Sequence, residues 1–430
     1  MLKIIQADGE AERRQIADMR ARAAETGEGI NATAAAVLKD VRESGYKAVE
    51  RYSMQFDKAA PREITKEEVE AAYAACPQEL IEAMETAAEN IRDYNEKLLP
   101  RTMEWHNPAG GTVGRIVRGL TRVGIYVPGG TAAYPSTVLM NAIPARIAGV
   151  GEIIMVTPPG RDGAVNPHIL AAAKIAGVTR IYKVGGAQAV AALAYGTGTI
   201  PQVDKIVGPG NAYVAEAKRQ VFGRVNIDMI AGPSEVLVLA DGRSNPAWVA
   251  ADLLSQAEHD RMAAAVLVTD SRPLAEAVAH ELERQLAALP RAEIARASLE
   301  ANGKLIVCRD LREGIAVANR IAPEHLELCV DNPFDYLGEI QNASSVFLGR
   351  YNPEPMGDYF AGPNHTLPTM GTARFYSPLS VDDFVKKSQF SYYTRDALAR
   401  DYRKVSLFAR KEGLDAHARA VDIRFEGGEA

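Results

Sequence analysis

Apolar residues in roughly the first hundred positions recur every three or four residues, which is the spacing of amphipathic helices. Two stripes of this kind can be read from the sequence: Val37, Leu38 and Val41, and then Leu80, Ile81, Met84 and Ile91. The segments that carry them are rich in Ala and Glu, which favour helix. The pattern therefore predicts that the N-terminal part of the chain is mainly helical.

Beyond this region, short apolar runs bounded by glycines alternate with helical patterns. Four runs lead into turns rich in glycine: Arg122–Val127, Glu152–Val156, Arg180–Val184 and Lys205–Val207. A second series alternates with helical patterns in the same way: Glu235–Ala240, Ala264–Val268, Lys304–Cys308 and Ser345–Leu348. Repeated strand–turn–helix units predict mostly parallel sheets covered by helices. We therefore expect an α/β protein with two Rossmann-like parallel-sheet domains.

The C-terminal segment follows a different pattern. Ser380–Asp383 resembles a helix capping box, and a helical stretch from about Arg395 to Glu412 stops at Gly413. This tail is too small to bury a core of its own, so it must pack on the body or on a second subunit. The expected organisation is an N-terminal helical arm (1–25), an α/β domain in two pieces (26–125 and 236–375), a second α/β domain (126–235) and a helical tail (376–430).

Composition and charge narrow the class of protein. A chain of 430 residues with 47% apolar and 24% charged residues is typical of a folded protein too long for one core. Its net charge of −6 argues against a nucleic-acid-binding surface. No secretory signal or long apolar span is visible, and the three cysteines (Cys76, Cys308 and Cys329) form no C-x-x-C pair. A reducing, cytoplasmic location is therefore expected.

Three glycine-rich turns are candidates for binding a nucleotide: Pro128–Gly130, Gly185–Gln188 and Gly208–Asn211. Backbone N–H groups at the start of a helix bind phosphate well, and each turn follows a predicted strand and precedes a helical pattern. None of the turns has the spacing G-x-G-x-x-G, and each alone could be an ordinary tight turn. Together they favour a dinucleotide or phosphate ligand that is bound in a non-standard way.

Four segments place histidine beside carboxylate or amide groups. They contain Gln256 with His259 near a helix end, Glu324 with His325, Asp358 with His365, and Glu412 with His417. The alternative for each is structural, such as a histidine that interacts with a helix dipole or a charged group in a turn. His106, His168 and His280 lie in unremarkable settings. The other four histidines and Asp358 would suit zinc, but no H-x-x-x-H pair occurs, so such a site must be assembled from distant segments.

Nine runs, in order along nearly the whole chain, resemble the histidinol dehydrogenase family. They are Tyr126–Gly130, Tyr134–Met140, Gly185–Gln188, Val207–Asn211, Ala231–Val236, Asp252–His259, Ala322–Glu327, Ala361–His365 and Glu412–His417. The resemblance implies an intertwined homodimer of two-domain subunits in which the tail of one subunit completes the site of the other. It also implies that the 126–235 domain binds NAD and that the domain in two pieces holds zinc and the catalytic groups.

The resemblance also assigns roles to individual residues. It implies zinc ligands at Gln256, His259, Asp358 and His417, and NAD contacts at Tyr126, Gln188 and Asn211. Glu324 matches the group that activates water, and His325 matches the general acid/base. Contacts to the substrate are implied for Ser234, Gln256, His259, Glu324, His325, Asp358, His365, Glu412 and His417. No cysteine lies beside a recognisable base, so a thiol nucleophile is not expected.

The expected activity is zinc-dependent oxidation of L-histidinol to L-histidine through L-histidinal, with reduction of two NAD, as the last steps of histidine biosynthesis. One alternative is a related zinc- and NAD-dependent dehydrogenase that acts on another amino or sulfonated alcohol. A second, of a different class, is a zinc hydrolase with Glu324 as base, which would leave the three glycine turns without a role. A third is a metal-stabilised binding protein without catalysis, which would leave Glu324 and His325 unexplained.

Overall fold

A computed structural model describes residues 2–10, 13–14, 16–17, 28–129 and 134–426 of the chain. The chain divides into two compact units: 1–98 with 120–384, and 99–119 with 385–430. Gly130 of the first predicted nucleotide turn, and residues 1, 11–12, 15 and 18–25 of the expected N-terminal arm, lie outside the described residues. None of the described helices combines the length and the apolar character needed to cross a membrane.

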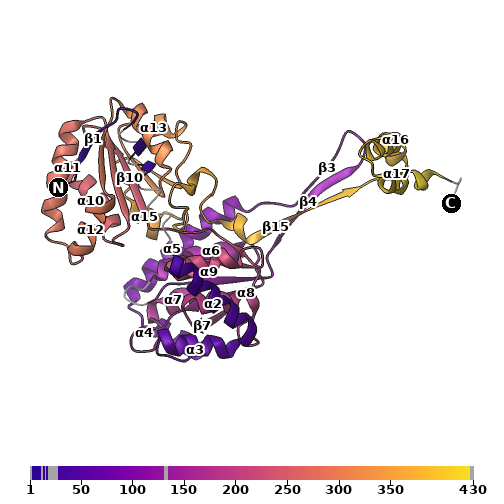
Figure 1. Ribbon diagram of the computed structural model, residues 1–430, viewed down its shortest axis with the longest axis horizontal. Coiled ribbons are helices and arrows are strands. Elements are labelled where there is room, and N and C mark those ends of the chain that lie inside the picture. Colours follow the sequence, from indigo (N-terminus) through magenta and orange to yellow (C-terminus); the bar gives the residue numbers. More distant parts are fainter. Residues whose placement is uncertain (1, 11–12, 15, 18–27, 130–133, 427–430) are drawn as a thin grey trace. The chain divides into compact units, whose positions relative to one another are not determined.

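Sheet A, the first of two six-stranded sheets in the first unit, is parallel throughout (Figure 1). In spatial order its strands are β1 (Ile4–Gln6), β12 (Lys304–Val307), β11 (Ala264–Thr269), β10 (Glu235–Ala240), β13 (His325–Cys329) and β14 (Ser345–Leu348). Successive side chains of β10 enter different apolar clusters, with Val236 and Val238 in one and Leu237 and Leu239 in the other. Both faces of this strand are therefore buried, as its continuous apolar run predicts.

Helices cover both faces of sheet A. Their bounds are α10 (Pro246–Ala257), α11 (Arg272–Leu286), α12 (Ala292–Asn302), α13 (Leu311–Ile321), α14 (Phe334–Leu337) and α15 (Glu354–Tyr359). Helix α10 begins as its sequence predicts, because the Asn245 side chain accepts a hydrogen bond from Ala247 N and Pro246 occupies the first turn. Because α10 connects the parallel neighbours β10 and β11, its C-terminal end returns to the edge of the sheet at which β10 begins.

Sheet B is parallel except for its short edge strand β2. Its strands, in spatial order, are β2 (Arg62–Glu63), β7 (Arg180–Lys183), β6 (Glu152–Thr157), β5 (Arg122–Tyr126), β8 (Lys205–Val207) and β9 (Asn226–Ile227). Its helices are α2 (Glu28–Ser44), α3 (Tyr46–Phe56), α4 (Lys66–Ala75), α5 (Gln78–Leu98), α6 (Pro135–Ile147), α7 (Pro167–Ala176), α8 (Gly186–Tyr195) and α9 (Ala212–Val221). The predicted glycine-rich turns follow β5, β7 and β8.

The division of the chain between the two sheets differs from the one expected. The stripe of Val37, Leu38 and Val41 on α2 shares a core with residues of sheet B, so the N-terminal helices do not belong with sheet A. Strand β5 lies in the middle of sheet B, although residues 26–125 were expected to join 236–375. The expected helical arm contributes strand β1 to sheet A. An amphipathic stripe shows that a face is buried, but not against which sheet.

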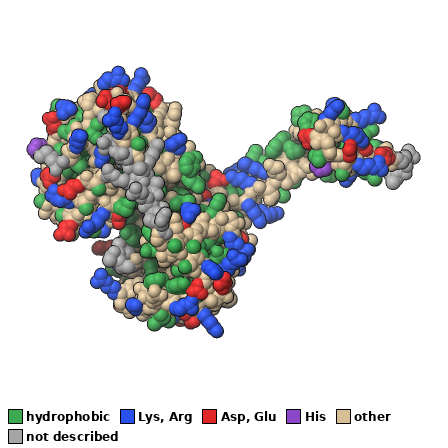
Figure 2. All heavy atoms as spheres, in the orientation of Figure 1, with side chains coloured by type: hydrophobic (Ala, Val, Ile, Leu, Met, Phe, Trp, Pro, Cys, Tyr) green, Lys and Arg blue, Asp and Glu red, His purple; other side chains and the backbone are tan. Residues whose placement is uncertain are grey.

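The second unit combines an antiparallel sheet with two helices. The sheet has the order β15 (Val385–Tyr392), β4 (Thr112–Gly119) and β3 (Met103–His106), and the helices are α16 (Arg395–Lys411) and α17 (Asp415–Asp422). The tail, which was expected to be helical, thus also includes a strand that pairs with residues far earlier in the chain. Apolar side chains such as Leu407 and Phe408 are exposed on this unit, where Figure 2 shows hydrophobic side chains at the surface.

Candidate active site

A pocket of about 250 Å³ in the first unit brings together most of the residues expected to contact substrate. We call it the site pocket. Its lining includes Ser234, Gln256, His259, Glu324, His325, Asp358 and His365. It also includes groups from the sheet B side, among them Pro128 and Gly210. Segments separated by more than two hundred positions therefore meet at one place.

Strand order explains why these residues meet. Ser234 directly precedes β10 and Glu324 directly precedes β13, and the two strands are parallel neighbours with Val236 opposite His325. Helix α10 returns to the same edge, which places Gln256 in its last turn. Asp358 comes from α15. The catalytic candidates thus lie at the amino ends of sheet A strands, whereas ligands of parallel sheets usually bind at the carboxyl ends.

The backbone of Glu235 holds both catalytic candidates. Its N–H donates to Glu324 Oε2 at 2.8 Å, and its carbonyl oxygen lies 2.9 Å from His325 Nδ1. A carbonyl only accepts hydrogen bonds, so Nδ1 must carry a proton, and in the neutral ring Nε2 then presents its lone pair. Nε2 is buried without a hydrogen-bond partner, 3.7 Å from Asp358 Oδ1. This tautomer makes Nε2 the atom that can accept a proton from a bound ligand.

Burial sets the electrostatics of the pocket. It raises the pKa of Glu324 to about 7, which brings this carboxyl into the range where it exchanges protons at neutral pH. Burial alone would lower the pKa of His325, but the adjacent carboxylates of Glu324 and Asp358 outweigh it and raise this pKa to about 10. Without a cation among them, these carboxylates therefore stabilise the charged form of His325, whereas a cation bound to them would favour the neutral ring that can accept a proton.

Glu354 is a site residue that the sequence analysis missed. It lines the pocket, is almost fully buried, and places Oε1 3.8 Å from His325 Nε2. Burial raises its pKa to about 8. Its position four residues before Asp358, on the same face of α15, is the signal that could have identified it.

The donor set in the site pocket suits a metal ion. Gln256 is almost fully buried, and its Oε1 has no hydrogen-bond partner. His325, Glu354 and Asp358 present ligand atoms that all lie within 4.8 Å of one another. His365 Nδ1 lies 3.0 Å from the backbone oxygen of Asp358 and so helps to fix the loop that follows α15. Buried acceptors without donors are the groups that a cation satisfies.

Two expected site residues lie elsewhere. Glu412 and His417 belong to the second unit, where they line a shallow hollow with Lys404, Val405, Phe408 and Ala409. The site pocket of the first unit therefore contains three of the four expected zinc ligands, namely Gln256, His259 and Asp358.

A cavity of about 520 Å³, which we call the nucleotide cavity, lies at the carboxyl ends of sheet B strands. Its lining includes Tyr126, Gln188 and Asn211, the three residues expected to contact NAD. Glycines at the starts of α8 and α9 also line it, and the Tyr126 hydroxyl accepts a hydrogen bond from Gly186 N at 3.0 Å. Pro128 and Gly210 line both the nucleotide cavity and the site pocket, so the two are adjacent.

Comparison with known proteins identifies the family. The model of the family described as histidinol dehydrogenase matches residues 20–425. The chain belongs to the histidinol dehydrogenase family. It is 55% identical to histidinol dehydrogenase from Clostridium acetobutylicum, over 91% of each chain, and 53% identical to that from Geobacter metallireducens, over 97% of each. A crystal structure of histidinol dehydrogenase from Elizabethkingia anophelis superimposes with a TM-score of 0.94 at 39% identity, covering 99% of this chain and 98% of that one.

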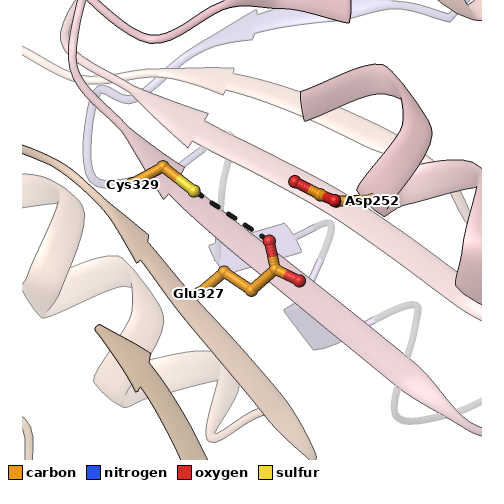
Figure 3. A group of neighbouring side chains, drawn as sticks. All are labelled: Asp252, Glu327 and Cys329. Carbon is orange, nitrogen blue, oxygen red and sulfur yellow. Dashed lines mark hydrogen bonds between the residues drawn. The ribbon is translucent and has the colours of Figure 1, made fainter. Parts of the chain in front are cut away.

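Membership of the histidinol dehydrogenase family shows that the chain is an oxidoreductase. The positions of the described cysteines indicate whether a thiol could attack the substrate. Cys329 and Glu327 of β13 lie beside Asp252 of α10 (Figure 3), with Cys329 Sγ 4.0 Å from Glu327 Oε2. Burial raises the pKa of this thiol far above its usual range. The described residues that line the site pocket include no cysteine. The expectation that no thiol attacks the substrate agrees with this geometry.

We expect Glu235→Gln to stabilise the metal-free protein at alkaline pH. Part of Glu235 is exposed, but its Oε2 is buried without a hydrogen-bond partner. Burial raises the pKa of this carboxyl to about 8. A folded-state pKa above the unfolded value means that stability is complete at acidic pH and is lost as pH rises through about 8. The variant should therefore gain about 1–2 kcal/mol at pH 9 and nothing at pH 5 in urea unfolding. Equal effects at both pH values would contradict this reasoning.

Proposed function

We propose that this chain oxidises L-histidinol to L-histidine through L-histidinal and transfers two hydrides to two NAD, as the last steps of histidine biosynthesis. The observation that carries the proposal is the assembly of one pocket. It joins Glu324, His325 and three of the expected metal ligands, and it adjoins a cavity lined by Tyr126, Gln188 and Asn211.

Gln256, His259 and Asp358 would hold zinc, with His417 of a second copy as the fourth ligand. When bound, the metal supplies a positive centre that fixes the imidazole and amino nitrogens of the substrate. The unsatisfied Oε1 of Gln256 supports this role, because a buried amide oxygen without a donor otherwise costs stability. The exposed placement of Glu412 and His417 in the second unit, which has little core of its own, supports a homodimer in which these residues enter the partner's site.

Proton transfer is assigned to two neighbouring side chains. In the first step His325 Nε2 accepts the proton of the alcohol while the carbon loses a hydride to NAD. In the second step Glu324 accepts a proton from the water that adds to the aldehyde carbon, and the hydrated aldehyde loses the second hydride. Each step reduces one NAD. The first step releases one proton and the second releases two, because the acid that forms ionises to a carboxylate. Buried Glu324, with its pKa near 7, is suited to act as the base.

The nucleotide cavity suits the dinucleotide. The starts of α8 and α9 line this cavity, so the positive ends of their helix dipoles would favour a diphosphate there. Pro128 and Gly210, shared with the site pocket, indicate where the nicotinamide would approach the substrate. A zinc hydrolase would leave this cavity without a role, which favours the dehydrogenase.

The test is NADH formation from a limiting amount of L-histidinol. We expect two NADH for each L-histidinol, loss of the activity after chelation, and recovery when zinc is returned. A panel of other amino and sulfonated alcohols serves as the control for substrate. If zinc-loaded protein that binds NAD formed no NADH from L-histidinol, the substrate assignment would be wrong and the alcohol panel would identify its replacement.

A further inference from the structure

Asp57 is a charged residue in the nucleotide cavity that the proposed mechanism does not use. It follows the last residue of α3 and is held there by a hydrogen bond from its own N–H to Ser53 O at 2.8 Å. Its carboxylate oxygen Oδ2 is buried without a hydrogen-bond partner. Burial raises the pKa of Asp57, although a hydrogen bond from the backbone of Gly185 lowers it in part. An incompletely satisfied buried carboxylate costs free energy and needs an explanation.

The position of Asp57 in the cavity indicates which part of a dinucleotide it would meet. Pro128 and Gly210 mark the end that adjoins the site pocket, where the nicotinamide must lie. Asp57 belongs instead to the wall formed by α2 and α3, with Thr33, Val37 and Phe56, none of which lines the site pocket. This wall is away from the nicotinamide end, on a side of the cavity that would receive the adenosine half of the ligand.

The charge of the cavity indicates how that half is recognised. Asp57 is the one charged side chain among the described residues that line it, and these include no lysine or arginine. A carboxylate accepts hydrogen bonds from the hydroxyl groups of a ribose, whereas a 2′-phosphate needs a cationic partner and is repelled by a carboxylate. The cavity therefore suits a ribose with a free 2′-hydroxyl.

We propose that Asp57 binds the 2′-hydroxyl of the adenosine ribose and so selects NAD over NADP. The inference rests on the proposed binding of NAD in this cavity and adds the residue that determines specificity. Asp57 acts only in recognition, so its removal changes the affinity for the dinucleotide and not the identity of the proton-transfer groups.

The test is calorimetric binding of NAD, NADP and the 2′-deoxyadenosine analogue of NAD to the full-length protein at pH 8, without substrate. We expect the wild-type protein to bind NAD at least about 10-fold more tightly than either of the other two. In Asp57→Asn, affinity for NAD should fall about 10-fold or more, and the preference over NADP should shrink by a similar factor. Asp57→Asn should then bind NAD and its 2′-deoxyadenosine analogue with nearly equal affinity.

Asp40→Asn is the matched control, since this carboxylate lies on α2 but does not line the cavity. It should leave all three affinities unchanged. If Asp57→Asn weakened the three ligands equally, or if the wild-type protein bound the deoxy analogue as tightly as NAD, Asp57 would have only a structural role and the proposal would be overturned. The comparison of NAD with its deoxy analogue uses the wild-type protein, so it tests the proposal even if Asp57→Asn does not fold. Failure of the wild-type protein to bind NAD at all would instead refute the proposed cofactor.

Discussion

Glu324→Gln is expected to slow oxidation of L-histidinal by about 10²–10⁴-fold, the usual contribution of a general base, while oxidation of L-histidinol is much less affected. Glutamine keeps the acceptor for the N–H of Glu235, so the loop before β13 should stay in place. It cannot accept the proton of water. In a rapid-mixing experiment the variant should therefore form one NADH per site quickly and the second slowly.

The pH dependence of the second step gives an independent readout of the same group. Burial raises the pKa of Glu324 to about 7, and only the ionised form acts as a base. Oxidation of the aldehyde should thus become faster between pH 6 and pH 8 in the wild-type enzyme and lose this dependence in the variant. Glu300→Gln, an exposed carboxyl on α12, is the control. Equal slowing of both oxidations by Glu324→Gln would rule out the assigned role.

Mixing two inactive variants should restore activity if the second unit completes the site of a partner. His417→Ala is expected to reduce zinc content and activity, because it removes one ligand of the proposed metal site. Glu324→Gln removes the base. If the tail of each subunit enters the site of its partner, a hybrid dimer of the two variants has one site with both changes and one site with neither. After subunit exchange at random, about a quarter of the wild-type activity should therefore return.

The outcome separates the two possible arrangements. If each tail completes the site of its own chain, every site in every dimer carries one of the changes and no activity returns. Metal analysis of His417→Ala alone is the accompanying control, since unchanged zinc would remove His417 from the ligand set. His168→Ala, a histidine on α7 that lines neither the site pocket nor the nucleotide cavity, should leave zinc content and activity unchanged.

Family motifs and local patterns predicted much of the candidate site. The runs around Gln256 and Glu324 identified residues that share a pocket, although spacing alone would not have suggested a glutamine ligand. Glycine-rich turns after apolar runs predicted where a nucleotide would bind, because a turn, a strand and a helix start are all local features. Glu354 and Asp57 were missed because neither lies in a recognised motif, and their importance depends on what surrounds them.

The sequence alone determined the α/β class, the position of most strands and the chemical groups available, since hydrophobic periodicity and turn residues act over a few neighbouring positions. Tertiary structure alone decided which sheet the N-terminal helices cover and that β10 lies beside β13. That adjacency allows the backbone of Glu235 to hold Glu324 and His325, residues about ninety positions away. Such contacts follow from strand order and burial, which depend on the packing of the whole chain and leave no local pattern in the sequence.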